Sequence, residues 1–313
     1  MTNSITQVAG IDTGKAWLDV ASHPSGERAR FANGAAGHRA LRTWLSAQGV
    51  TRIGIEASGG YEQEVVADLR RQGLEVALLQ PRQVSAFRQY KGRRAKTDDL
   101  DAALIAECTA HLGELPEAPD PRLAAFAQHL LFIEQLEADV VRIKTRREHF
   151  TDPRILRWID RDIEARKRRC IAELALLKTR LCKHADLEKR LGLVESVAGI
   201  GLRTALTLVI LLPELGKISR EQIAALVGVA PYDDSSGQRT GDRHIAGGRA
   251  RVRRALFNAA LPASQRWNQA LVGLYGRLKT KGKAHKTALI ACVRKLLIFA
   301  NAVIERGTPW IKA

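Results

Sequence analysis

The feature that most constrains the fold of this chain is a change of hydrophobic pattern near residue 120. Before that point, short apolar runs rich in strand-forming residues alternate with helical patterns. The predicted strands are 8–12, 17–20, 52–56 and 76–79, and the predicted helices are 36–48 and 61–72. Strands that alternate with short helices are typical of a sheet with parallel strands covered by helices, so we expect an α/β unit over about 7–110.

Beyond residue 120, apolar residues recur in steps of mostly three and four, the period of an amphipathic helix. They are Leu123, Phe126, Leu130, Ile133, Val140 and Ile143, followed by Ile155, Ile159, Ile163, Cys170, Leu174, Leu177 and Leu181. Asp152 and Pro153 separate the two series, which predicts an antiparallel, coiled-coil-like hairpin of two long helices. Because two helices cannot bury both stripes alone, we expect a second copy of the chain to pack against them.

From Glu195 the chain is again helical. Two glycines, Gly199 and Gly201, precede an apolar helix. This arrangement is similar to a helix-hairpin-helix turn that offers backbone N–H groups to a phosphate, and it fits a plain turn between helices equally well. We therefore expect three regions: an α/β domain over 1–115, a helical coiled-coil linker for oligomerisation over 116–190, and a mainly helical C-terminal domain over 191–313.

Positive charge is concentrated in the last quarter of the chain. The formal net charge is +17, and residues 241–313 hold fifteen Lys and Arg against only Asp242 and Glu305. A composition with 45% hydrophobic residues excludes a disordered basic tail. A folded protein with so uneven a charge is stabilised by a polyanion, so we expect nucleic acid as a partner.

The sequence also bears on location. The longest uncharged stretches fall far short of the roughly 20 apolar residues that span a bilayer. The first residues lack the basic lead and apolar core of a signal peptide. Four scattered cysteines, with no Cys-x-x-Cys pair, argue against a zinc site and a disulfide framework. We expect a protein without a membrane span that works in a reducing cytoplasm.

Four carboxylates in the α/β region are candidate metal ligands: Asp12, Glu56, Asp98 and Asp101. Asp12 and Glu56 end apolar strands, where an uncompensated carboxylate is costly and where α/β folds place their ligands. Asp98 and Asp101 are three residues apart and share one face of a helix, although acids after Thr97 also suit a helix N-terminus. Two Mg²⁺ ions would compensate the four charges, and acids in this order are typical of a RuvC-type, ribonuclease-H-like nuclease.

A second candidate site is the turn Asp233-Asp-Ser-Ser-Gly237, which precedes a basic helix. It fits an ordinary polar turn. It also fits a serine nucleophile toward phosphorus, with nearby arginines and the helix N-terminus after Gly248 stabilising the charge that develops. On that helix, Arg249 and Arg253 share one face.

Taken together, these segments resemble the DEDD-type transposases of bacterial insertion sequences, the insertion sequence 110/1111 family of bridge-RNA-guided recombinases. The matching segments are Gly10-Ile-Asp-Thr-Gly-Lys, Ile55-Glu-Ala-Ser-Gly-Gly-Tyr-Glu, Lys96-Thr-Asp-Asp-Leu-Asp-Ala, Gly199-Ile-Gly, Leu226-Val-Gly-Val-Ala-Pro-Tyr and Gly247-Gly-Arg-Ala-Arg-Val-Arg-Arg-Ala-Leu-Phe. The resemblance covers nearly the whole chain, with the segments in the expected order.

The resemblance implies a role for each matching position. Asp12, Glu56, Asp98 and Asp101 match the tetrad that binds Mg²⁺ in the RuvC-like domain. The serine of the family's Asp-Ser-Gly turn becomes joined to DNA, and counting from either side of the turn selects Ser236. Ser235 occupies the usual Asp position, so the choice stays open by one residue. Residues expected to contact nucleic acid are Arg243, Arg249, Arg251, Arg253, Arg254, Lys279, Lys281, Lys283 and Lys286.

The resemblance further implies the partners. They are donor and target DNA, a structured non-coding guide RNA, and further copies of the chain, as a dimer or a dimer of dimers when active. Two alternatives stay open: a metal-dependent junction endonuclease in which the serine only shapes a turn, and a non-catalytic RNA- or DNA-binding protein.

Overall fold

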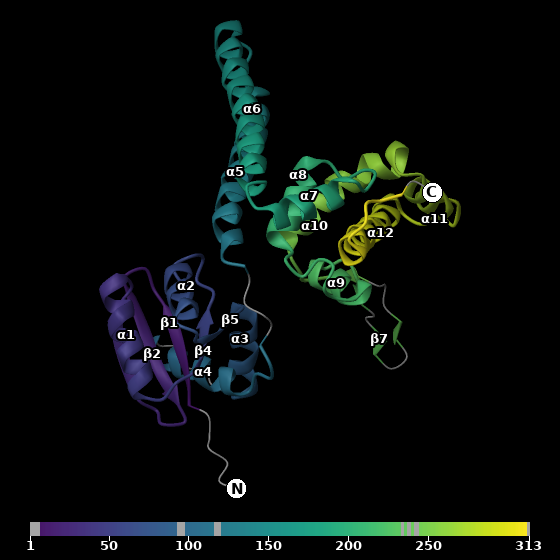
Figure 1. The fold of residues 1–313 in the computed structure, drawn as a ribbon. Helices are drawn as coiled ribbons and strands as arrows, with labels where there is room; N and C mark the ends of the chain where they lie inside the picture. Colours follow the sequence, from purple (N-terminus) through teal and green to yellow (C-terminus); the bar gives the residue numbers. More distant parts are fainter. Residues whose placement is uncertain are drawn as a thin grey trace. The chain divides into compact units, whose positions relative to one another are not determined.

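The computed structural model describes residues 7–92, 98–115, 120–232, 235–236, 239–240 and 244–311. The chain divides into two compact units, Met1–Pro119 and Asp120–Ala313, and each is described by itself. The first is built on a mixed sheet with helices, and the second is mostly helical (Figure 1). The expected division of the second part into a linker and a C-terminal domain stays a prediction.

Unit 1 is built on a five-stranded sheet. Its strands are β1 (Val8–Thr13), β2 (Trp17–His23), β3 (Arg28–Ala32), β4 (Arg52–Glu56) and β5 (Glu75–Leu79), in the order β3-β2-β1-β4-β5. β1, β4 and β5 are parallel, whereas β2 and β3 run antiparallel to their neighbours. The four predicted strands are confirmed. β3 was not predicted, and it makes the sheet mixed.

Helices cover both faces of this sheet. α1 (Ala35–Ala47) and α2 (Gln63–Arg71) pack on one face, where Leu41, Leu45 and Leu69 meet Ile11 and Ile55 in a dry core. Between β5 and the last helix of the unit lies α3 (Pro81–Tyr90). α4 (Asp98–Ala110) contacts β1, β2 and β4. Because side chains alternate along a strand, alternate residues of β1 and β4 reach the two faces.

Unit 2 begins with a long antiparallel helical hairpin (Figure 1). Its arms are α5 (Arg122–Arg147) and α6 (Pro153–Leu181), and the side chain of Asp152 caps α6 by accepting a hydrogen bond from Arg154 N at 2.7 Å. Ile159 and Ile163 pack against Val140 in a small core near the tip. Both helices and their apolar stripes were predicted from the sequence, and both are present.

The rest of unit 2 is a helical body. Its elements are α7 (Ala185–Glu195), α8 (Leu202–Leu211), α9 (Arg220–Val227), α10 (Ala250–Pro262), a π-helical turn η1 (Ala263–Trp267), α11 (Gln269–Thr280) and α12 (His285–Arg306). The base of the hairpin joins the same core, since Leu130 and Leu177 cluster with Leu206 and Leu296. Hairpin base and helical body are therefore one packed structure.

α12 is the one described helix long and apolar enough to cross a membrane by length and composition. No such helix was predicted from the sequence. Half of its apolar window is buried inside unit 2, and Leu296 and Leu297 are fully covered. Its Asn301 accepts a hydrogen bond from Gly216 N and donates one to the carbonyl of Ile218. These contacts are those of a core helix.

Candidate catalytic site

The register of the sheet brings two of the predicted acids together. Gly10 pairs with Gly54 and Ile11 with Ile55 in the parallel β1–β4 ladder, so Asp12 and Glu56 are the next neighbours along it. On its other side Asp12 is the direct partner of Asp19 in β2. Asp12, Glu56 and Asp19 thus follow one another across three adjacent strands, and Asp12 and Glu56 are half-buried. Asp12 and Glu56 carry like charges on neighbouring strands, whereas Asp19 forms an ion pair with Arg30 of β3 at 2.6 Å.

Two glycines let α4 pack directly on this face. Gly10 and Gly54 each lie two residues before an acid and therefore face the same side as that acid. A Cβ at Gly10 would lie 2.2 Å from Ala106 N and 2.3 Å from Ala102 O, and one at Gly54 would lie 1.8 Å from Thr109 Oγ1. Because Gly10 and Gly54 have no side chains, the helix that carries Asp98 and Asp101 can pack directly against the strands that carry Asp12 and Glu56. This role of the two glycines was not predicted from the sequence.

Asp101 is buried, with 7% of its surface exposed. Its Oδ1 accepts a hydrogen bond from Arg88 Nη2 of α3 at 2.5 Å, so an arginine compensates its charge. Asp98 is the first residue of α4, and its side chain lies outside the described residues. Within the described part of the chain, no three His, Cys, Asp or Glu side chains are close enough together to hold a metal ion. Asp12, Glu56 and Asp101 are described and do not form such a group, so the tetrad with Asp98 remains a prediction.

Glu62 shapes the loop that follows Glu56. It is 7% exposed, and its Oε2 accepts hydrogen bonds from Ser58 N at 3.1 Å, Ser58 Oγ at 3.0 Å and Gly60 N at 2.9 Å. Burial alone would raise the pKa of Glu62, but these hydrogen bonds outweigh it and hold the pKa below its ordinary value. Glu62 therefore stays charged and fixes the turn beside the acids as a structural residue.

The serine segment is a pair of short ladders between α9 and α10. β6 (Pro231–Tyr232) pairs with β9 (His244–Ile245), and β7 (Ser235–Ser236) pairs with β8 (Arg239–Thr240). The side chains of both serines lie outside the described residues. The acids belong to unit 1 and the serines to unit 2.

Arg253 holds the two ends of this segment together. Its Nη1 donates to the carbonyl oxygens of Gly247 at 2.6 Å and Val227 at 3.0 Å, from either side of the segment. Gly248 has φ +68°, and a Cβ there would lie 2.3 Å from Gly228 N. Arg253 and the glycines thus bring together the two ends of the segment that contains the serines.

Several predicted nucleic-acid contacts are used inside the protein. Arg249 makes two 2.6 Å contacts with Glu214, and Arg251 donates to Glu134 at 2.7 Å. Arg203 also binds Glu134, so this glutamate joins α5 to α8 and α10. The predicted basic residues that are exposed are Arg254, Lys279, Lys281, Lys283 and Lys286, and Arg243 lies outside the described residues.

The glycine turn between α7 and α8 packs against η1. Asn268 Nδ2 donates to Ala198 O at 2.9 Å, and a Cβ at Gly199, where φ is +96°, would lie 2.4 Å from Ala263 Cβ. These contacts explain why glycine is needed at Gly199. They are structural contacts and leave the phosphate-binding alternative a prediction.

Most of the chain is similar to known protein families and relatives. A family described as transposase, of the DEDD IS110 type, matches residues 9–151, and the family described as transposase IS116/IS110/IS902 matches residues 191–276. The pilin gene-inverting proteins of Moraxella lacunata and Moraxella bovis are each 27% identical over 323 residues, covering 97% of this chain and 97% of the relative. An uncharacterized 43.6 kDa protein of insertion element IS110 from Streptomyces coelicolor is 30% identical over 115 residues, 36% of this chain and 28% of that protein.

Proposed function

Because this chain belongs to the IS116/IS110/IS902 family of transposases, we propose that it is a recombinase that cuts and rejoins DNA to mobilise an insertion sequence. The observation that carries the proposal is the placement of Asp12 and Glu56 side by side on the sheet face that α4 covers. The mixed sheet supports a ribonuclease-H-like, RuvC-type nuclease domain. The Moraxella relatives are named for inverting a pilin gene, and this name supports recombination.

The residues at this edge fit a divalent metal. Every candidate ligand is a carboxylate, the group that Mg²⁺ prefers, and Asp12 and Glu56 lie next to each other on adjacent parallel strands. Asp12, Glu56, Asp98 and Asp101 would hold it. Bound there, Mg²⁺ would polarise a phosphodiester and stabilise its developing charge. Arg88 holds the carboxylate of Asp101 in place, and Glu62 fixes the loop after Glu56.

Ser236 would be the nucleophile. Its Oγ forms a bond to phosphorus as the bond from phosphorus to the 3′ oxygen breaks. The serine hydroxyl loses its proton, and the departing oxygen takes one up to become a free 3′ hydroxyl. The phosphoserine bond conserves the energy of the broken linkage, so attack by a 3′ hydroxyl of another strand reverses the chemistry without ATP. Arg253 supports the step by closing the base of the serine segment.

The acids and the serine lie in different units of the chain, so an active site could combine unit 1 of one copy with unit 2 of another. The hairpin supports such an assembly: Trp158 is 68% exposed and Ile171 70% exposed on α6, which leaves apolar surface for a partner copy. We propose a dimer, and a dimer of dimers when active. Its place of action is the bacterial cytoplasm, at the nucleoid, without a membrane.

A structured non-coding RNA would choose the DNA sequence by base pairing. The exposed lysines Lys279, Lys281, Lys283 and Lys286 support this division of labour, since phosphate contacts position a nucleic acid without reading its sequence. Sequencing the RNA that copurifies with the protein tests it. One defined small RNA is expected, and random cellular fragments would contradict RNA guidance.

Covalent protein–DNA adducts test the nucleophile. With Mg²⁺ and DNA carrying the element ends, wild-type protein should form adducts resistant to denaturation, and Ser236→Ala should form none. Ser235→Ala is the matched control and should retain them. If Ser236→Ala still cuts the DNA, the protein is a junction endonuclease that uses water. If the two serine variants exchange behaviour, the nucleophile is Ser235.

Substitution of the acids tests the metal site. Asp12→Asn and Asp101→Asn should abolish cleavage while DNA binding persists, because each change removes a charge that holds the metal. Glu27→Gln, at an exposed residue of the same unit, is the control and should keep activity. Recombination that survives both Asn variants would indicate a binding protein in which these acids are structural.

A further inference from the structure

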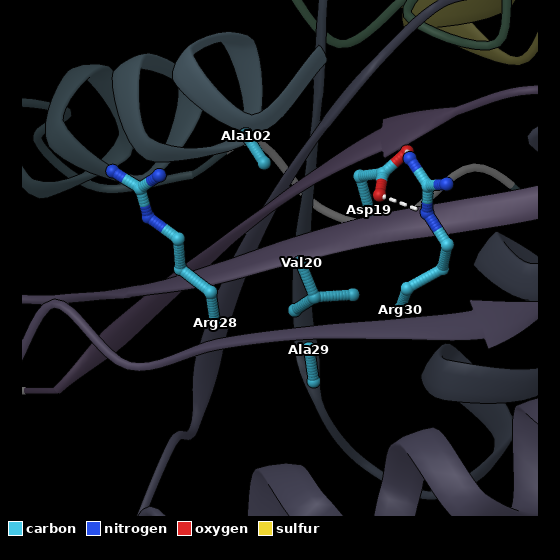
Figure 2. A pocket seen from close by; sticks show the side chains of 6 residues that line it. All are labelled: Asp19, Val20, Arg28, Ala29, Arg30 and Ala102. Atoms are coloured by element: carbon cyan, nitrogen blue, oxygen red, sulfur yellow. Dashed lines mark hydrogen bonds and ion pairs between the residues drawn. The ribbon is translucent and has the colours of Figure 1, made fainter.

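A pocket opens between strands β2 and β3 and the start of α4. Figure 2 shows the six residues that line it: Asp19, Val20, Arg28, Ala29, Arg30 and Ala102. The cavity volume is about 220 Å³. A water molecule takes about 30 Å³ of liquid, so this space admits a phosphate group with its first waters. None of the roles described above uses this pocket.

Two arginines and one aspartate are among the residues that line the pocket. Arg30 donates to Asp19 through two hydrogen bonds, Nε to Oδ1 at 2.6 Å and Nη2 to Oδ2 at 3.1 Å, which fixes its guanidinium. Arg28 is exposed on the same strand, and no described residue forms an ion pair with it. In Figure 2 the side chain of Arg28 extends toward α4. With one carboxylate against two guanidiniums, the pocket is suited to an anion.

The pocket adjoins the acids of the proposed catalytic site. Asp12 pairs with Asp19, and Asp19 pairs with Arg30, so the three residues form one row across β1, β2 and β3. Neighbouring strands are about 4.8 Å apart, which places β3 about 10 Å from β1. One DNA strand advances about 3.4 Å of helix axis per nucleotide. The pocket therefore lies within a few nucleotides of a phosphate held at Asp12. On its other wall, Ala102 directly follows Asp101 in α4.

We propose that Arg28 and Arg30 bind a backbone phosphate of the DNA strand being cut, a few nucleotides from the scissile bond. The proposal rests on the DNA-cutting function proposed above. Arg28 makes the direct contact, because its guanidinium, which has no ion-pair partner among the described residues, can form paired hydrogen bonds with phosphate oxygens. Asp19 orients Arg30. β3 is an edge strand, so no further strand of the sheet blocks the approach of DNA from that side. The backbone of one DNA strand can then contact both the pocket and the acids.

Labelling of arginines in the intact protein tests the contact. Phenylglyoxal, which modifies exposed guanidiniums, is applied with and without a mixed-sequence DNA duplex, and labelled peptides are quantified by mass spectrometry. DNA should protect Arg28. Arg39 is the internal reference, because it is exposed on α1, on the opposite face of the sheet, and should stay reactive. Equal labelling of Arg28 with and without DNA would overturn the proposal, as would equal protection by inorganic phosphate or protection by an RNA duplex alone.

The salt dependence of DNA binding gives a second measurement. Arg28→Ala should lower the slope of log affinity against log salt by about 0.9, the loss of one phosphate contact, whereas Arg39→Ala should not change it. Identical slopes for both variants would refute the contact. Neither measurement requires cleavage, so a failure of the proposed function, seen as absent adducts with wild-type protein, is distinguishable from a failure of this inference.

Discussion

Replacing Gly10 or Gly54 by alanine should damage the site without touching an acid. The new Cβ would lie 2.2 Å from Ala106 N in the first case and 1.8 Å from Thr109 Oγ1 in the second. Thr109 is fully buried and Ala106 N belongs to the helix backbone, so α4 must move outward as a whole. Overpacking of a well-packed core costs about 1–3 kcal/mol. At roughly 4 °C per kcal/mol for a unit of this size, the melting temperature should fall by about 4–12 °C.

Two assays separate stability from chemistry in these variants. Thermal unfolding by circular dichroism measures the first, and adduct formation well below the melting temperature measures the second. Since Asp98 and Asp101 move with α4, Gly10→Ala should lose activity even where it is fully folded. Gly113→Ala is the control, because a Cβ there meets nothing within 4 Å. Wild-type melting and wild-type activity in both Gly10→Ala and Gly54→Ala would refute the close packing of α4 on the acids.

Three further results are expected. Arg253→Ala should make the serine segment more sensitive to limited proteolysis and slow adduct formation, whereas Arg254→Ala should leave the proteolysis unchanged, because of these two arginines only Arg253 bonds to the carbonyls that close the segment. Burial would raise the pKa of Glu214, but its ion pair with Arg249 holds the pKa below the ordinary 4.5. The stabilisation of the fold by this ion pair should be present above about pH 4.5 and disappear as the pH falls through the lowered pKa. In Glu214→Gln, melting followed against pH should lack this contribution. Trp158→Ala should weaken self-association in sedimentation experiments with little change in melting, because this side chain is 68% exposed.

Local pattern was enough to predict much of unit 1. β1, β2, β4 and β5 are apolar runs, and their bounds agree with the prediction within a few residues. β3 was missed because its sequence, Arg-Ala-Arg-Phe-Ala, places two arginines among three apolar residues and lacks a continuous apolar run. α3 was missed for a related reason, since only Val84 of that helix is buried.

The candidate site shows where sequence reasoning fails. The run of arginines after Gly248 indicates nucleic-acid contacts, yet Arg249 and Arg251 bind Glu214 and Glu134, which are 35 and 117 residues away along the chain. Such pairings depend on tertiary packing and leave no local signal. One signal was available and was not used: Gly10 and Gly54 each precede an acid by two residues, which places a glycine and a carboxylate on the same face of two strands.

The ion pairs of Glu134 with Arg203 and Arg251 join the hairpin rigidly to the helical body. With 29 residues in α6, the arm is about 43 Å long at about 1.5 Å per residue. Since the base of the hairpin shares one core with the helices that follow it, a rotation of the base by roughly 10° moves the far end by about 8 Å. A partner that binds the tip of the hairpin would therefore change the orientation of the helical body that carries the serines. A small rotation at the base corresponds to a large displacement at the tip.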